Sequence, residues 1–231
     1  MPGIRPQREA RMGAMPDTMQ PVPFPSVYQL RVVVRGVSPL IWRRLLIPAD
    51  TTIAGLHAVL QVAFGWTGTH LHRFVVQGRE YGIGYVGGPS FGDDPQRVRL
   101  GDLGLRRTER FTYHYDFTAG WCLDLRVEEI LVDEPGRHVP GCTGGRRAGP
   151  PEDCGGVQAF LENTQAHHVL AAAIRAAEIL DMLLDDEDVP RFGEHRDELA
   201  ALLPLLGVNR FDRRTLNRAL AALSATGARA A

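Results

Sequence analysis

The sequence predicts an α+β fold: a mostly antiparallel sheet with one helix after its first hairpin and C-terminal helices packed on it. Several segments between residues 27 and 128 alternate apolar and polar residues, and from Val157 onward the pattern is helical. This order lacks the regular β-α alternation of a doubly wound parallel fold. Residues 1–26 hold six prolines and no apolar signal core. We therefore expect a disordered arm at 1–26 and a single domain at 27–231, helical over 157–225.

The first two strands are expected to form a hairpin. From Val27 to Val34, apolar residues largely alternate with Gln and Arg, the pattern of a strand with one buried face. Ser38-Pro39 turns the chain, and the run Leu40–Ile47 supplies the second strand, which ends at Pro48. The two strands should therefore pair antiparallel.

A helix follows the hairpin. Apolar residues recur at helical spacing from Ile53 to Phe64. Thr51 or Thr52 can cap the start of this helix, and Gly65 suits the position just past its end.

Four further strands are predicted before the chain changes character. Two short ones meet at Gln77-Gly78, a dipeptide that suits a tight turn. The two clearest strands flank the turn Thr118-Ala119-Gly120, and residues 82–96 form a loop. The predicted strands cover 72–76, 79–81, 111–117 and 121–128.

The last third of the domain is predicted to be helical. Residues 135–156 are rich in Gly and Pro and are expected to form a loop. Three helices should follow, the last one capped by Asp212. Their expected ranges are 166–184, 194–206 and 213–223.

Composition argues against a membrane-spanning protein and against a phosphate-binding loop that uses lysine. The net charge is −1, and no apolar run reaches the roughly 18 residues of a membrane helix. Three cysteines, an odd and sparse set, indicate a reducing, cytoplasmic location. All 26 basic residues are arginine, so a phosphate-binding loop with its lysine is absent.

Two histidines and two cysteines are the candidate metal ligands. His70 and His72 lie two apart and face the same side of an extended strand, although a structural pair is the alternative. Cys142 and Cys154 are the candidate ligands of a zinc ion, completed by His138 and by Asp153. The alternative is that both thiols are buried and free, and no other cofactor is expected.

The C-terminal helices have the outline of a helix-turn-helix. The residues that would supply phosphate and base contacts to DNA are Arg210, Arg213, Arg214, Asn217 and Arg218. However, residues 157–231 hold eight Arg against eleven Asp and Glu, the wrong balance for a free-standing DNA-binding module. A packed helical hairpin with an arginine-rich outer face is the alternative.

Five strings in combination resemble one protein family. The chain is similar to the Ri-plasmid Orf-three-like family, whose members are often labelled TnpR-type passenger proteins of insertion elements. The resemblance spans about Val27 to Leu223 and implies an α+β fold with an antiparallel sheet. It implies no established activity and no resolvase chemistry. The strings are Ile41–Trp66, His70–Phe74, Tyr113–Trp121, Cys142–Gly156 and Phe211–Leu220.

One departure from the family bears on catalysis. Family members commonly have YDFGDxWxH in the strand-turn-strand segment. Here Asp116 is kept, but Thr118 and Ala119 replace the Gly-Asp pair and Leu123 replaces the His. The resemblance thus implies that two polar members of any acid-base or metal site are missing, which argues against an enzyme.

The sequence therefore predicts an uncharacterised, cytoplasmic accessory protein of plasmid or insertion-element type, acting as a non-catalytic binding module. Its partner is a protein or a nucleic acid, and its oligomeric state stays open. One alternative is a metal-assisted hydrolase or nuclease at the same surface. The other is a protein that binds DNA through the C-terminal helices. The candidate binding surface contains His70, His72, Tyr115, Asp116, Trp121, Arg146, Glu152 and Asp153.

Overall fold

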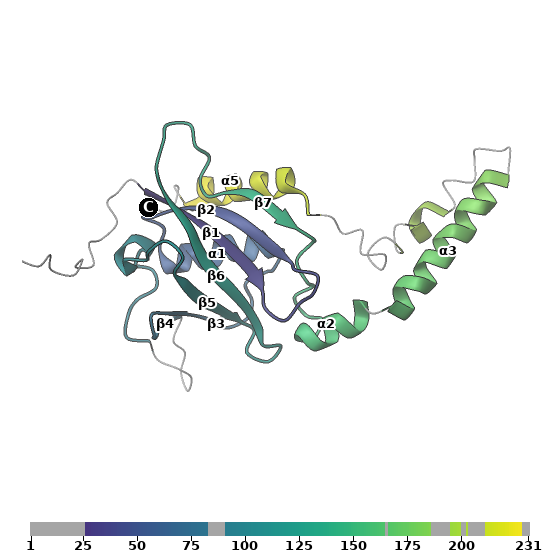
Figure 1. Cartoon of the computed structure of the whole chain (residues 1–231), viewed down its shortest axis with the longest axis horizontal. Helices are drawn as coiled ribbons and strands as arrows, with labels where there is room; N and C mark the ends of the chain where they lie inside the picture. The colour runs from purple at the N-terminus through teal and green to yellow at the C-terminus, as the bar shows by residue number, and fades with distance from the viewer. Residues whose placement is uncertain are drawn as a thin grey trace, which may run out of the picture.

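Within the described residues, a seven-stranded antiparallel sheet forms the centre of the protein (Figure 1). The structure is a computed structural model, which describes residues 26–82, 91–164, 166–185, 195–199, 202 and 211–227. The strands lie in the order β4-β3-β5-β6-β1-β2-β7. Their bounds are β1 Ser26–Val34, β2 Trp42–Pro48, β3 His72–Val76, β4 Arg79–Gly82, β5 Arg110–Tyr115, β6 Trp121–Val132 and β7 Gly141–Arg146.

Helices interrupt and follow the strands, which confirms the α+β class. The predicted caps of the first helix are also confirmed. Thr52 Oγ1 accepts a hydrogen bond from the Gly55 N–H at 3.0 Å, and Gly65 has a left-handed φ of 75°. The helices are α1 Ile53–Phe64, α2 Gly156–Thr164, α3 Ala166–Asp185 and α5 Arg213–Gly227, with a 3₁₀ helix, η1, at Leu100–Leu103.

The two faces of the sheet differ in character. In β1, β2, β3, β5 and the first half of β6, buried residues alternate along the strand and form the inner face, which packs against α1. Each fully buried Leu or Val there contributes roughly 1.5–3 kcal/mol. Leu216 and Leu220 of α5 join this core, so the prediction that a C-terminal helix packs on the sheet is confirmed for α5. The other face is polar and carries arginines in several strands.

The strand β7 corrects the prediction of a loop over 135–156. This glycine-rich segment pairs with β2 as the last strand of the sheet. Its pairing relies on backbone hydrogen bonds, so it needs no apolar alternation, and the sequence pattern gave no sign of it. The glycines leave room for rings: a Cβ at Gly145 would lie 2.7 Å from the Phe211 ring.

Strand ends also differ from the prediction. β5 stops at Tyr115 because Asp116 adopts a left-handed φ of 49°. Phe117 therefore leaves the strand alternation and is exposed. β2 begins at Trp42 and includes Pro48 as its last residue.

Several predicted segments fall partly or wholly outside the described residues. The expected arm at 1–26 lies outside the described residues except for Ser26, the first residue of β1. Of the predicted helix 194–206, the structure describes only residues 195–199 and 202. In Figure 1, α3 extends away from the sheet beyond α2. None of the helices in the described ranges combines the length and the apolar character needed to cross a membrane.

Candidate functional site

Five of the predicted residues, His70, Tyr115, Asp116, Glu152 and Asp153, converge where the α1–β3 connection, the end of β5 and the loop before α2 meet. No contact of the Arg146 side chain with this cluster is found among the described residues. Trp66 stacks on Tyr115, with ring centroids 5.0 Å apart, and its indole N–H donates to the Pro150 carbonyl at 3.0 Å. Trp121 donates its indole N–H to the Glu152 carbonyl at 3.2 Å. The two tryptophans therefore hold the loop before α2 against the sheet.

Glu152 is the buried carboxylate of this cluster. It accepts hydrogen bonds from the Thr67 N–H at 2.8 Å, from the Thr67 hydroxyl at 2.7 Å and from the Tyr115 hydroxyl. Burial alone would raise the pKa of Glu152, but these hydrogen bonds outweigh burial and lower it. Burial and the contact with Glu152 raise the pKa of Tyr115 to about 12. The carboxylate is thus an ionised clamp between three segments of the chain.

His70 lies between two further carboxylates. Its Nε2 is 3.1 Å from Asp153 Oδ1, and its Nδ1 is 3.9 Å from Asp116 Oδ1. Asp116 is itself fixed, because Oδ1 accepts from the N–H groups of Thr118 and Ala119. About a third of the His70 side chain is exposed. The two carboxylates therefore orient an imidazole ring that is partly open to solvent.

His72 has a different role from the one predicted for it. Its ring stacks on His57 with centroids 3.6 Å apart, and only 7% of the residue is exposed. His57 Nδ1 in turn lies 2.7 Å from the Tyr113 hydroxyl. Burial and His72 lower the pKa of His57 to about 3, and burial lowers the pKa of His72 to about 4. His72 is therefore a neutral core residue, unable to join His70 at the surface.

Burial divides the eight predicted binding residues into two groups. Tyr115 and Trp121 are fully buried, because the alternation of β5 and β6 turns them to the inner face. With His72, Asp116 and Glu152 they support the cluster from below and meet no partner directly. The residues that a partner can reach are His70, Arg146 and Asp153.

The two candidate zinc ligands occupy separate surroundings. Cys142 is buried on β7 with its Sγ 3.2 Å from the Gly144 carbonyl, and Cys154 lies before α2 with its Sγ 3.9 Å from the Gly156 carbonyl. Burial raises the pKa of both thiols. Across the described part of the chain, no three His, Cys, Asp or Glu side chains are arranged to hold a metal ion. Zinc binding stays a prediction, which elemental analysis of the purified protein tests.

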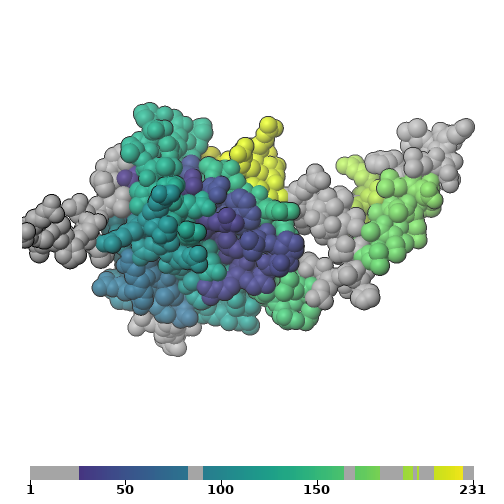
Figure 2. Space-filling model, in the orientation of Figure 1, coloured from purple at the N-terminus to yellow at the C-terminus, as the bar shows by residue number. Residues whose placement is uncertain are grey.

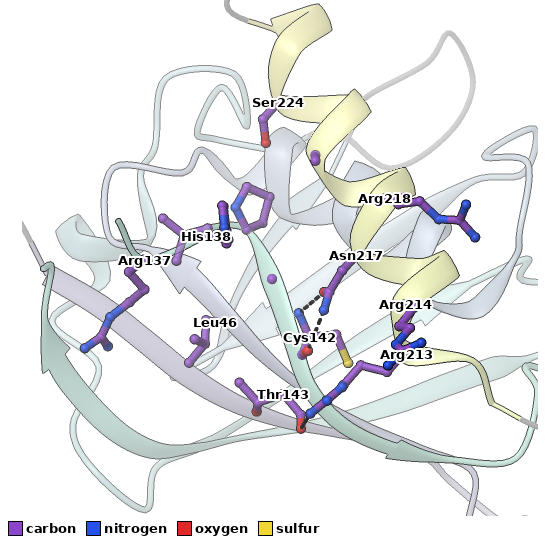
Figure 3. A pocket seen from close by; sticks show the side chains of 14 residues that line it. Leu46, Arg137, His138, Cys142, Thr143, Arg213, Arg214, Asn217, Arg218 and Ser224 are labelled. Atoms are coloured by element: carbon purple, nitrogen blue, oxygen red, sulfur yellow. Dashed lines mark hydrogen bonds between the residues drawn. The ribbon is translucent and has the colours of Figure 1, made fainter. Parts of the chain in front are cut away.

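A cleft of about 1090 Å³ lies between β7 and α5 (Figure 3). The segment before β7 contributes Arg137, which pairs with Glu134 at 3.0 Å, and His138. The polar side chains that line the cleft are Arg137, His138, Thr143, Arg213, Arg214, Asn217, Arg218 and Ser224.

The charges of this cleft are all of one sign. Arg213 donates to the Thr143 carbonyl at 3.2 Å and Arg218 to the Thr215 hydroxyl at 3.0 Å, so both bind neutral acceptors. No Asp or Glu belongs to the lining. Arg137 pairs with Glu134, whereas no ion pair of Arg213, Arg214 or Arg218 is found in the described part of the chain. This surplus of arginine creates a positive potential that attracts anions. Of the four arginines that line the cleft, Arg213, Arg214 and Arg218 were predicted from the sequence as phosphate contacts.

Sequence reasoning did not identify two further sets of arginines as binding candidates. These are Arg137, in a segment predicted to be a plain loop, and the arginines on the outer face of the sheet. The available signal was the recurrence of arginine at the polar positions of successive strands. The outer-face residues are Arg31, Arg44, Arg110 and Arg126.

The fold and the site together define an α+β protein in which helices cover one face of an antiparallel sheet and a cationic cleft lies at the sheet edge. The chain belongs to the plasmid pRiA4b ORF-3-like family, which matches residues 26–190 and confirms the resemblance found in the motifs. It is 35% identical over 150 residues to the uncharacterized protein y4hQ of Sinorhizobium fredii (strain NBRC 101917 / NGR234), covering 61% of this chain and 73% of that protein.

A solved structure shares the fold. The crystal structure of MM3350, a protein of unknown function from Methanosarcina mazei Go1, has a TM-score of 0.55 and 29% sequence identity to this chain. The match covers 83% of this chain and 93% of MM3350. The relatives thus support the family and the fold, while function has to be argued from the site.

Proposed function

We propose that this protein is a non-catalytic binding module that holds the phosphate backbone of nucleic acid in the cleft between β7 and α5. One observation carries the proposal: every charged side chain that lines the cleft is an arginine. Guanidinium groups bind phosphate through two parallel hydrogen bonds and stay charged at any physiological pH. A cleft with several of them and no carboxylate suits a polyanion.

The position of α5 favours the same ligand. Arg213 and Arg214 lie in the first turn of this helix, where the helix dipole adds partial positive charge. Asp212 stays beside that turn as its cap, accepting from the Arg214 and Thr215 N–H groups. The helix end is therefore stable without an external anion, and the guanidinium groups remain available for one.

The cellular role is part of the proposal. A binding module for nucleic acid fits an accessory protein of a plasmid or insertion element, as expected from the family resemblance. Contact with the element's own DNA would take place in the cytoplasm. The TnpR label implies nothing further, since the proposed activity is binding without strand cleavage.

The test is binding to a fluorescein-labelled duplex of about 20 base pairs, measured by anisotropy at several salt concentrations. We expect salt-sensitive binding that is lost in Arg213→Ala/Arg214→Ala/Arg218→Ala, with the slope of log K against log salt reduced by about 3. The control removes the same charge elsewhere, in Arg79→Ala/Arg97→Ala/Arg196→Ala. Equal loss in both variants, or no binding by the wild type, would contradict the proposal.

A metal-assisted hydrolase or nuclease is the second candidate. The observation in its favour is the placement of His70 between Asp116 and Asp153. Incubation of the protein and of a His70→Gln variant with Mg²⁺, Mn²⁺ or Zn²⁺ and labelled DNA or a phosphate ester tests it. Turnover by the wild type and none by the variant would favour catalysis over pure binding.

A further inference from the structure

The outer face of the sheet is open and positively charged. Figure 2 shows atoms of β1 and β2 (purple) beside those of β6 (teal) at the surface of this face. A groove of about 780 Å³ crosses it between β1, β5 and β6. The charged residues that line the groove are Arg31, Arg35, Arg110, Asp124, Arg126 and Glu128.

Four arginines stand in one row across this face. Strand pairing places Arg44 of β2 opposite Arg31 of β1, and Arg31 opposite Arg126 of β6. Arg126 is in turn opposite Arg110 of β5. Neighbouring strands lie roughly 4.8 Å apart, so the row places one arginine on each strand at that spacing. Like charges directly opposite each other destabilise a sheet, so a row of four is costly without an anion.

The carboxylates on this face neutralise only part of that charge. Glu128 binds Arg44 through two hydrogen bonds, of 2.5 and 3.1 Å. Asp124 is engaged by Arg35, an arginine outside the row. For Arg110 and Arg126, no ion pair is found in the portion of the chain that the structure describes. Two neighbouring arginines at one end of the row thus lack an anion.

The β2 end of the row lies close to the cleft described above. The Thr143 hydroxyl donates to the Arg44 carbonyl at 3.4 Å, which links the end of the row to β7. Arg213 donates to the Thr143 carbonyl at 3.2 Å, which links β7 to α5. Two hydrogen bonds therefore connect the last arginine of the row to the first arginine of the cleft.

An aromatic ring lies beside the row. The guanidinium carbons of Arg31 and Arg44 are 4.9 and 5.7 Å from the centroid of the Trp42 ring. Sheet surfaces that bind single-stranded nucleic acid combine a line of cations with aromatic rings and guanidinium planes. The cations bind the phosphates, and the bases stack on the planes. A single strand can follow a shallow sheet groove along its whole length, whereas a duplex meets it on one side only.

We propose that the row Arg44, Arg31, Arg126 and Arg110 is a binding track for single-stranded nucleic acid, which continues past Thr143 into the β7–α5 cleft. This inference rests on the proposed function, because the cleft receives one end of the strand. It adds a preferred substrate, a single strand, and a second set of contacts.

The experiment compares fluorescein-labelled oligothymidylates of about 6 and about 20 nucleotides, with the wild type and an Arg31→Ala/Arg110→Ala/Arg126→Ala variant. The wild type should bind the longer strand at least about tenfold more tightly, because only that strand spans track and cleft. The variant should lose this length dependence, and its slope of log K against log salt should fall by about 2. Arg79→Ala/Arg97→Ala/Arg196→Ala, with the same net charge, should bind like the wild type.

The outcomes separate this inference from the proposed function. If duplex and single strands both fail to bind, the proposed function falls and the track falls with it. If the wild type binds nucleic acid but the track variant keeps the length dependence and the slope, the track alone is overturned. If polyglutamate of similar length displaces the oligonucleotide at equal concentration, the face binds acidic polypeptides and the nucleic-acid assignment is overturned. Circular dichroism of each variant confirms that it is folded.

Discussion

The side-chain amide of Asn217 pairs with the backbone of Cys142 as a neighbouring strand would. Its Oδ1 accepts from the Cys142 N–H at 2.6 Å, and its Nδ2 donates to the Cys142 carbonyl at 3.0 Å. β7 is the edge of the sheet, and edge strands expose unpaired backbone groups. One residue thus covers part of the edge and fixes how α5 presents its arginines over the cleft.

Replacing this residue should loosen α5. Asn217→Ala leaves a half-buried N–H and carbonyl on Cys142 without their partner, so we expect the free energy of unfolding to drop by about 1–3 kcal/mol. Urea unfolding measures it. Ser224→Ala on the same helix is the control, with an expected change within about 0.5 kcal/mol, because that exposed hydroxyl bonds only its own helix. Equal midpoints for the two variants would show that the paired amide is dispensable.

Glu152 should make stability depend on acid pH. Its pKa in the folded protein lies below the ordinary value, so its contribution is complete above about pH 4.5 and is lost as the pH falls through the folded pKa. Glu152→Gln should cost about 1.5–3 kcal/mol at pH 7, since three hydrogen bonds to a charged group weaken. The wild type and the variant should converge in thermal stability toward pH 3. A constant gap between the two down to that pH would argue against the clamp.

The stacked histidines predict a second, separate pH window. The pKa of His57 is lowered to about 3 and that of His72 to about 4, whereas both are near 6.5 in the unfolded chain. The unfolded state therefore binds more protons below pH 6.5, and stability falls from there toward pH 4. The slope should approach ~1.4 kcal/mol per pH unit for each histidine. Urea unfolding between pH 4 and 7.5 measures it.

Replacing His72 by the aromatic residue Phe isolates its contribution to the pH dependence of stability. His72→Phe keeps an aromatic ring against His57 but removes one titrating group, so the slope between pH 4 and 6.5 should decrease by about half. If His72→Phe unfolds with the wild-type slope, the stacked pair does not control stability in this window.

Local patterns predicted much of the fold and only part of the site. The ends of α1 follow from Thr52 and Gly65, whose cap geometries depend on neighbours along the chain. The inward direction of Tyr113 and Tyr115 also follows, because alternation along a strand is a local property. β7 could not be found this way, since its pairing with β2 uses backbone groups that every sequence has.

The sequence by itself determined the family, the α+β class, the alternating faces of the strands and the arginines of α5. Only the tertiary structure decided that Tyr115 and Trp121 are buried supports rather than exposed binding residues. It also decided the row of sheet arginines, which depends on strand register and on the irregularity in β1 at Gln29 and Leu30. The physical reason is that register is set by contacts between residues far apart in the chain, and a one-residue slip would move every side chain of a strand to the opposite face.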